Sequence, residues 1–373
     1  MAIVRFGDVV RRANTKEDKD NTDLEFYVGG EHIDSGEIQV TKRGIIKGST
    51  IGPMFYFGFK AGQVLIVSRN PHLKKAGMVK FDGICSEKTF VVESSDESVL
   101  LQEYLPFIVQ SDDFWKFAEE NKSGSVNYFV NWTTFARYEF DLPSLEEQKR
   151  LAEVLWAAED EKQAILRAIE KAKVYKNALL HSLFKSDGEK VKIDYYCTLV
   201  KQKYTGEHTG VNAIELECIE QGTGQLLKIN DSITGRSGYT LFQPGDVLFG
   251  KLRPYLKKYH LSSFEGICCN EIWAIRAKET TTSKFIYYIL SSEDFVNFNN
   301  NQSFGTKMPR SSWKIASQFE CPLVSMDEQS LFVQNAEKID ETILNLRNVI
   351  DSLNDFIRVK FNTLAGGGAL NVQ

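Results

Sequence analysis

The chain has 373 residues, which is enough for two or three domains with sizeable cores. Its 25% charged and 42% hydrophobic residues are ordinary for a soluble globular protein, and no apolar run is long enough to span a membrane. The N-terminus lacks the shape of a signal peptide, so we expect a cytoplasmic protein, and a net charge of −5 argues against a free-standing nucleic-acid binder unless positive charge is concentrated locally.

A first α/β region is predicted over residues 1–143. Short β-rich runs such as Val64–Val67 and Thr89–Val92 are separated by Gly and Asn turns, which is typical of strands in a sheet. Apolar residues near helical spacing then predict a helical segment over Leu100–Glu120. Trp132, near the end of the region, is expected to pack in its core.

A long helix is predicted over residues 144–185. Ser144 and Glu147 form an S-x-x-E capping box, in which the serine oxygen accepts a backbone N–H and the glutamate accepts the N–H of the serine. Apolar residues then alternate at intervals of four and three, the spacing of a coiled-coil seam, with no proline between them. The apolar seam residues are Leu151, Leu155, Ile165, Ile169, Leu179 and Leu183.

Two lysines interrupt this seam. Lys162 and Lys176 occupy seam positions, and we expect their aliphatic stems to lie along the seam while their amines reach water. The alternative is that they fix the helix register or contact a partner subunit.

A second α/β region and a second long helix follow. The region covers residues 186–324, with strand-like runs at Val247–Phe249 and Ile272–Ile275 and a helical segment at Ser283–Asn299. Ser325 and Glu328 form the capping box of a helix over residues 325–366, and residues 367–373 are expected to be a flexible tail. The second seam contains Ile339, Ile343, Leu346, Ile350, Leu353 and Ile357.

The second half of the chain repeats the first. Phe59–Ile66 matches Phe242–Phe249 at an offset of 183 residues, and Ser144–Gln148 matches Ser325–Gln329 at an offset of 181. Similarity at such a long period indicates that a domain and its helix occur twice. Antiparallel packing of the two helices would relate the two domains by a pseudo-twofold axis, which suits a target with two halves.

Positive charge is concentrated at corresponding places in the two repeats. Residues 42–88 contain nine basic and two acidic side chains, and residues 236–314 contain eleven basic and six acidic ones. The acidic excess lies elsewhere in the chain. This distribution favours contact with a polyanion despite the negative total.

No catalytic or metal-binding signature is present. The chain has no phosphate-binding loop, no H-E-x-x-H and no G-x-S-x-G, and its five histidines lack ligand spacing. Asn70–Leu73 shares only its first two residues with the Asn-Pro-Pro-aromatic motif of amino-methyltransferases, and we interpret it as a turn. The six cysteines form no C-x-x-C pair and are expected to be structural. We therefore assign no catalytic, cofactor-binding or metal-binding residue.

Four segments carry a family resemblance. Leu142–Leu155 opens a helix that ends with Leu179–Phe184, while Tyr27–Gly36 and Gly245–Lys257 lie in the two α/β regions. Together with the repeat and the order of the elements, they resemble the specificity subunit of a type I restriction-modification system. The resemblance covers nearly the whole chain.

This resemblance implies an α/β fold with two similar target-recognition domains, separated by two long antiparallel coiled-coil helices. It also implies a subunit without catalysis or cofactors of its own, in which each domain reads one half of a bipartite duplex DNA site. The helices would set the spacing and dock two DNA adenine methyltransferase subunits, and motor-nuclease subunits would complete the assembly. S-adenosylmethionine, ATP and Mg would bind to these partners.

Candidate DNA-contacting residues occur as clusters at matched places in the repeats. Shared lysines are expected to bind phosphates, because both half-sites have the same backbone. Residues that differ between the copies, such as His72 against Tyr255 or Asn70 against Arg253, are candidates for base recognition. The full set is Lys42, Arg43, Lys47, Arg69, Asn70, His72, Lys74, Lys75, Lys122, Lys251, Arg253, Tyr255, Lys257, Lys258, Lys307 and Arg310.

Two other functions stay open. A duplicated coiled-coil adaptor that binds only protein would keep the helices but would have no sequence-dependent affinity for DNA. An enzyme with an unrecognised site would turn over its substrate without a partner. The matched basic stretches argue against the adaptor, and the missing motifs argue against the enzyme.

Overall fold

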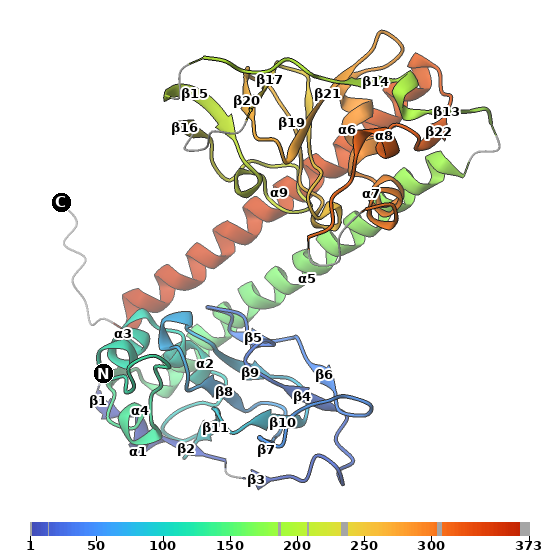
Figure 1. The fold of residues 1–373 in the computed structure, drawn as a ribbon. Coiled ribbons are helices and arrows are strands. Elements are labelled where there is room, and N and C mark those ends of the chain that lie inside the picture. Colours follow the sequence, from blue (N-terminus) through green and yellow to red (C-terminus); the bar gives the residue numbers. More distant parts are fainter. Residues whose placement is uncertain are drawn as a thin grey trace. The chain divides into compact units, whose positions relative to one another are not determined.

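The computed structural model describes residues 2–13, 15–185, 188–206, 209–232, 238–303 and 308–365, with side chains up to residue 360. The chain forms two compact units, Met1–Leu166 with Arg347–Gln373, and Arg167–Leu346 (Figure 1). The tail predicted over residues 367–373 lies outside the described residues. No helix in the described ranges is long and apolar enough to cross a membrane.

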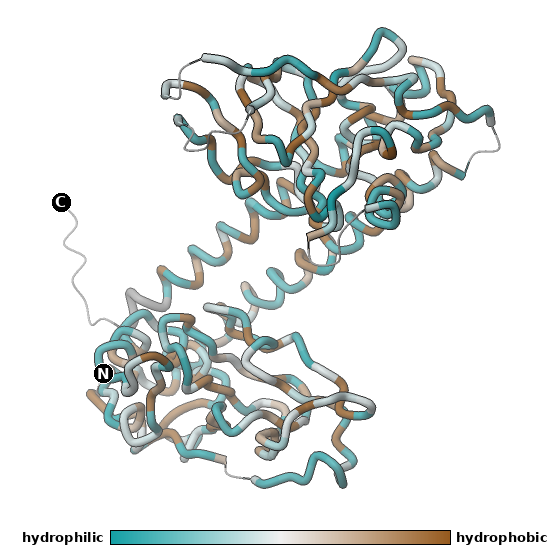
Figure 2. Tube along the Cα trace, viewed as in Figure 1, coloured by the Kyte–Doolittle hydropathy of each residue, from teal (hydrophilic) through white to brown (hydrophobic). Residues whose placement is uncertain are grey.

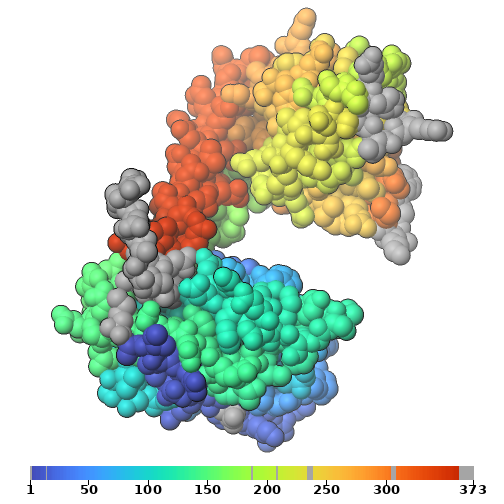
Figure 3. Space-filling view, turned by 90° about the vertical axis from the view of Figure 1, so that its left-hand side faces the viewer, coloured from blue at the N-terminus to red at the C-terminus, as the bar shows by residue number. Residues whose placement is uncertain are grey.

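The first unit contains two five-stranded sheets and a two-stranded one. Their strand orders are β2-β11-β8-β9-β5, β3-β7-β10-β4-β6 and β1-β12. In Figure 3 the N-terminal residues, in dark blue, lie on the surface of this unit beside teal and green segments, in agreement with the antiparallel pairing of β1 with β12. The strands are β1 (Ala2–Arg5), β2 (Val10–Arg12), β3 (Thr15–Lys16), β4 (Phe26–Val28), β5 (Gln39–Val40), β6 (Gly44–Ile45), β7 (Phe55–Phe59), β8 (Val64–Val67), β9 (Ala76–Val79), β10 (Gly83–Ser86), β11 (Thr89–Ser94) and β12 (Glu139–Leu142).

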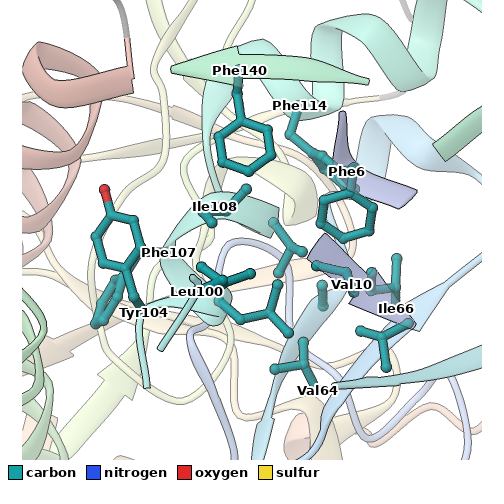
Figure 4. Packing of buried hydrophobic residues seen from close by; sticks show 14 of the residues in the cluster. Phe6, Val10, Val64, Ile66, Leu100, Tyr104, Phe107, Ile108, Phe114 and Phe140 are labelled. Carbon is teal, nitrogen blue, oxygen red and sulfur yellow. The ribbon is translucent and has the colours of Figure 1, made fainter. Parts of the chain in front are cut away.

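Strand β8 is buried on both faces, and its alternating side chains enter two different cores. Val64 and Ile66 pack in a cluster formed with helices and the start of α5 (Leu145–Phe184), part of which Figure 4 shows. Leu65 and Val67 pack in a second cluster toward the other five-stranded sheet. The short helices are α1 (Phe6–Val9), α2 (Leu105–Val109), α3 (Asp112–Glu120), α4 (Trp132–Phe135) and the 3-10 helix η1 (Pro71–Leu73).

The second unit repeats this plan. Its sheets have the orders β14-β21-β18-β19, β16-β15-β20-β17 and β13-β22. In β18, Val247 and Phe249 enter one core and Leu248 enters another. The strands are β13 (Lys190–Lys192), β14 (Cys197–Leu199), β15 (Thr209–Ile214), β16 (Asn230–Ser232), β17 (Thr240–Phe242), β18 (Val247–Gly250), β19 (Tyr259–Leu261), β20 (Gly266–Cys268), β21 (Ile272–Ala277) and β22 (Glu320–Pro322). The helices are α6 (Ser283–Ser291), α7 (Glu293–Asn301), α8 (Trp313–Ala316) and the 3-10 helices η2 (Ile193–Tyr195), η3 (Leu216–Cys218) and η4 (Pro254–Leu256).

The prediction of one helical segment after each set of strands is wrong in one respect, because each segment is two helices. Ser111 and Ser292, at an offset of 181, cap the second helix of each pair. Their side-chain oxygens accept hydrogen bonds from the backbone N–H groups of Phe114 and Phe295 at 3.1 and 3.2 Å. A serine that bonds its own backbone ends one helix and starts the next.

The two long helices are confirmed, α5 and α9 (Met326–Ala365). Apolar residues recur along both among polar ones (Figure 2). The second capping box is complete, since Glu328 N–H donates to Ser325 Oγ at 3.4 Å and Ser325 N–H donates to Glu328 Oε2 at 2.9 Å. In the first box Glu147 N–H donates to Ser144 Oγ at 3.4 Å, but the Glu147 carboxylate accepts from Arg150 at 2.6 Å instead of closing the box.

The seam packs within each unit. In the first unit Leu151 and Leu155 share a core with Ile357, and Leu353 packs against it. In the second unit the core cluster contains Leu180, whose side chain is more buried than that of Leu179, the predicted seam residue next to it. Two further seam residues of α5, Ile165 and Ile169, are buried. The other seam residues are partly buried: Leu179 and Leu183 of α5, and Ile339, Ile343, Leu346 and Ile350 of α9.

The seam lysines do not extend to water as expected. Lys162 is 3% exposed and lies between the carboxylates of Glu159 and Glu37, at 2.7 and 2.9 Å. Lys176 lies 2.6 Å from a carboxylate oxygen of Asp340. Both positions therefore hold buried or half-buried ion pairs, which agrees with the alternative that they fix the register.

Candidate nucleic-acid interface

A strained turn follows β8 in the first unit. Asn70 and Lys74 have φ values of 52° and 47°, in the left-handed region, and they flank the 3-10 helix Pro71–Leu73. A left-handed conformation costs a residue such as lysine roughly 1–2 kcal/mol and costs asparagine less. We refer to this segment as turn 70–74.

The same turn occurs after β18 in the second unit. Arg253 and Lys257 have φ values of 50° and 49° and flank the 3-10 helix Pro254–Leu256. Across the described ranges, the positive-φ residues other than glycine are these two and their two counterparts in turn 70–74. We refer to this segment as turn 253–257. The repeated strain shows that both units hold this backbone shape against an unfavourable local energy.

An ion pair anchors each turn to a neighbouring helix. Lys74 Nζ lies 2.7 Å from Asp112 Oδ1, and Lys257 Nζ lies 2.5 Å from Glu293 Oε1. The two acids are the first residues of α3 and α7, which pack against the 3-10 helices. The next lysine in each copy is also engaged, because Lys75 and Lys258 donate to the backbone oxygens of Gly30 and Leu216 at 2.5 and 2.6 Å.

The tips of the two turns face outward. His72 is exposed, Leu73 is 36% exposed and Tyr255 is 46% exposed, whereas the prolines that start the 3-10 helices are buried. The anchoring lysine and the leucine before it are therefore shared between the copies, while the exposed residue after the proline is His72 in one copy and Tyr255 in the other.

A second loop runs beside each turn. Asn70 N–H donates to Tyr128 O at 2.9 Å, and Arg253 N–H donates to Pro309 O at 2.7 Å. Lys122 of the first loop pairs with Glu119 at 2.7 Å and lies 4.4 Å from the ring centre of Tyr128. In the second unit Arg310 pairs with Glu271 at 3.1 Å, while Lys307 lies outside the described residues.

Two cations next to the turns form no direct ion pair in the described part of the chain, although Lys88 and, more weakly, Arg69 lower the pKa of the Glu87 carboxyl. Arg69 directly precedes turn 70–74 and is exposed, and Lys251 lies two residues before turn 253–257. The Nε atom of Arg253 is buried without a hydrogen-bond partner among the described residues. The structure thus brings most of the predicted cations of each repeat to one turn and its neighbouring loop.

The remaining predicted cations lie on either side of β6, with Lys42 and Arg43 before it and Lys47 after it. Lys42 pairs with Asp34 at 2.7 Å, in a segment that also contacts turn 70–74 through Gly36 N–H and Lys74 O at 3.2 Å. The Arg43 guanidinium lies over the rings of Phe26 and Phe81, with 3.9 and 4.6 Å to their centres. Lys47 is exposed and has no ion partner among the described residues.

The cysteines and two matched tryptophans pack in or against the apolar cores. All six cysteines are free, and burial raises the pKa of Cys85 and Cys197 to about 12, which keeps both as thiols. Trp132 packs against its core as expected, and Trp313, its repeat equivalent, packs against the core of the second unit. Sequence reasoning missed Gln148 and Gln329, which are 0% and 1% exposed. Their matched position after each capping box was a signal that could have identified them.

Comparison with known proteins gives a consistent result. No protein-family model matches the chain. The type I restriction enzyme EcoDI specificity subunit of Escherichia coli is 26% identical over 132 residues, which is 35% of this chain and 29% of that protein. The matched part thus spans less than a third of that relative.

Solved structures match over nearly the full length. The type I restriction-modification S subunit from M. genitalium has a TM-score of 0.60 at 10% identity, covering 99% of this chain and 96% of that one. A chain of a type I R-M system, solved to explain complex assembly and conformational transition, has a TM-score of 0.57 at 16% identity, covering 98% and 97%. The mixed α/β fold with its long central helix is thus shared with both solved chains, and the resemblance found in the sequence is confirmed.

Proposed function

We propose that this chain, which is similar to type I specificity subunits in sequence and fold, is the DNA-reading subunit of such an assembly and catalyses no reaction itself. Each α/β domain would recognise one half of a bipartite duplex site. The observation that carries this proposal is the pair of strained turns, which occupy matched positions in two similar units and are surrounded by cations.

The long helices would set the distance between the half-sites and dock two DNA adenine methyltransferase subunits. Those partners would bind S-adenosylmethionine and rotate the target adenine out of the duplex. Motor-nuclease subunits using ATP and Mg would complete the restriction enzyme in the cytoplasm. Exposed apolar residues on the helices, among them Val154, Val174 and Val359, would suit such protein contacts.

The negative total charge agrees with a shared DNA clamp. A chain with a net charge of −5 has a weak overall attraction for DNA, so local cations and positively charged partners would have to supply the phosphate contacts. The acidic partners of Lys74 and Lys257 further reduce the local charge at the turns.

Mapping N6-methyladenine tests the proposal. Cells that express the chain together with its methyltransferase subunits would be compared with cells that lack only this chain. We expect a split motif to be methylated only when the chain is present. Exchanging residues 1–143 with residues 186–324 should exchange the two halves of the motif. Unchanged methylation with a purified, intact complex would contradict the proposal and favour an adaptor that binds only protein.

A further inference from the structure

We infer that the tips of turn 70–74 and turn 253–257 distinguish the two half-sites, with His72 and Tyr255 as the side chains that contact base edges. This inference rests on the proposed function, since it names the residues that would select the DNA sequence. It also separates the anchored lysines of the turns from the base-contacting positions.

Two backbone hydrogen bonds close each turn. In turn 70–74, Leu73 N–H donates to Asn70 O and Lys74 N–H donates to Pro71 O, both at 2.9 Å. The matching bonds in turn 253–257 have the same length. A proline at the start of each 3-10 helix restricts the backbone further. A tip that is ordered before binding loses little conformational entropy when it contacts DNA.

The strain itself points to a binding role. Left-handed residues other than glycine persist only where the surrounding structure enforces them, and they concentrate at functional sites. Glycine would remove this strain, yet Asn70 and Arg253 occupy equivalent positions. Because the two copies differ at these positions but keep the conformation, the shape of the turn is the shared property.

The shared scaffold and the different tip have separate roles. Lys74 and Lys257 are held by acids at the starts of α3 and α7, so we assign them to positioning the turns. The exposed His72 and Tyr255 face solvent at equivalent positions. Imidazole and phenol groups differ in their hydrogen-bonding patterns, and DNA bases differ in the donors and acceptors that they present in the major groove. A shared turn backbone that carries a different exposed side chain in each unit suits two half-sites of different sequence.

Phosphate contacts would come from the cations beside the tips. Arg69 and Lys251 lie close to the turns in sequence, and among the described residues neither forms a direct ion pair, although the charge of Arg69 also acts on Glu87. Contacts of this kind position a protein on the duplex without selecting a base. The inference therefore predicts that changes at the tips alter the recognised sequence, whereas changes at these cations alter affinity.

Exchange of the tip residues tests the inference in the intact complex. The variants His72→Tyr, Tyr255→His and their combination would be expressed with the methyltransferase subunits, and methylated adenines would be mapped. We expect base preference to change at one or two positions, in one half of the motif for each single variant, with an unchanged spacer. Tyr195→His is the matched control, because Tyr195 is 43% exposed but lies in η2, and it should leave the motif unchanged.

The possible outcomes separate the inference from the proposed function. Absence of a split motif with the unaltered chain would overturn both. A normal motif for the unaltered chain and for all tip variants would overturn only the inference. If a variant abolishes methylation, the affinity of its purified complex for random duplex DNA distinguishes lost base recognition from lost DNA binding. Retained nonspecific affinity supports base recognition by the tip, and loss of that affinity contradicts it.

Discussion

Lys162 and Glu159 form an ion pair inside the first unit, with 2.7 Å between Nζ and Oε2 and with 3% and 0% of their side chains exposed. The repeat equivalent of Glu159 is Asp340, at an offset of 181, and it pairs with Lys176 at 2.6 Å. In the first unit the lysine lies three residues further along the same helix, whereas in the second unit it comes from the other long helix. The carboxylate position is thus kept in both copies while the source of the cation differs.

This difference has a consequence for helix pairing. The repeat equivalent of Lys162 is Ile343, and the equivalent of Lys176 is Ile357, which is buried in the first unit. A helix placed against the wrong partner would bring a lysine to an apolar position or leave a carboxylate unpaired, and buried unpaired charges are strongly destabilising. The pairs therefore specify which helix segment belongs to each unit.

Replacing Lys162 by Met should destabilise the chain by about 3 kcal/mol at pH 8, because Glu159 would stay buried without its main partner. Urea denaturation of the full chain, followed by circular dichroism, measures the free energy of unfolding. The exposed ion-paired Lys173, changed to Met, is the control and should have little effect. Equal effects for both variants would contradict the interpretation.

The same variant should show a defined pH dependence. Burial already raises the pKa of Glu159 in the folded protein, and loss of Lys162 removes the charge that opposes this shift. The folded state then binds a proton at higher pH than the unfolded state, so stability falls as pH rises from about 5 to 8. A Glu159→Gln change in the Lys162→Met background should abolish this added dependence. An unchanged profile in that double variant would exclude Glu159 as its source.

Gln148 should be important for stability, although none of its hydrogen-bond partners is a candidate DNA-contacting residue. Its side-chain amide donates to Val99 O and Pro143 O at 2.9 and 3.0 Å, and its oxygen accepts from Leu101 N–H at 2.9 Å. Gln148→Leu would leave these buried groups unpaired at a cost of roughly 1–3 kcal/mol each, reduced where water replaces the side chain. Thermal unfolding should show a clear decrease in midpoint, whereas Gln334→Leu at an exposed site of α9 should not.

Turn 70–74 should tolerate glycine but not a β-branched residue at position 70. Asn70→Gly relieves the left-handed strain, so stability should be unchanged or slightly higher. Asn70→Val should destabilise by roughly 1–2 kcal/mol, because valine is especially unfavourable in that conformation. Thermal unfolding of both variants checks this. Similar midpoints for Gly and Val would show that the turn does not keep this backbone shape.

The cations beside the turns should contribute to affinity without changing sequence preference. Removing one phosphate contact by Arg69→Ala or Lys251→Ala should reduce the slope of log affinity against log salt concentration by about one. Titration of a fluorescent duplex with the purified complex at several salt concentrations measures this slope. Lys60→Ala, an exposed position near the end of β7, is the control and should not alter the slope. A changed methylation motif in either variant would instead indicate base contact.

The repeat, the strands and the long helices could be predicted because their signals are local. Val64–Val67 and Ile272–Ile275 are strands as expected, and the long helices start directly after Ser144 and Ser325, the predicted capping serines. The single helical segments were wrong, because Ser111 and Ser292 interrupt them with caps that compete with helix continuity.

The sequence by itself determined that a domain and its helix occur twice and that positive charge is concentrated at matched places, since periodicity and composition need no information about distant contacts. Only the tertiary structure decided that Lys162 is buried, because its partner Glu37 is 125 positions away along the chain. It also decided that Lys74 and Lys257 anchor left-handed turns. The backbone conformation at those positions is imposed by packing against α3 and α7, and no local residue preference predicts it.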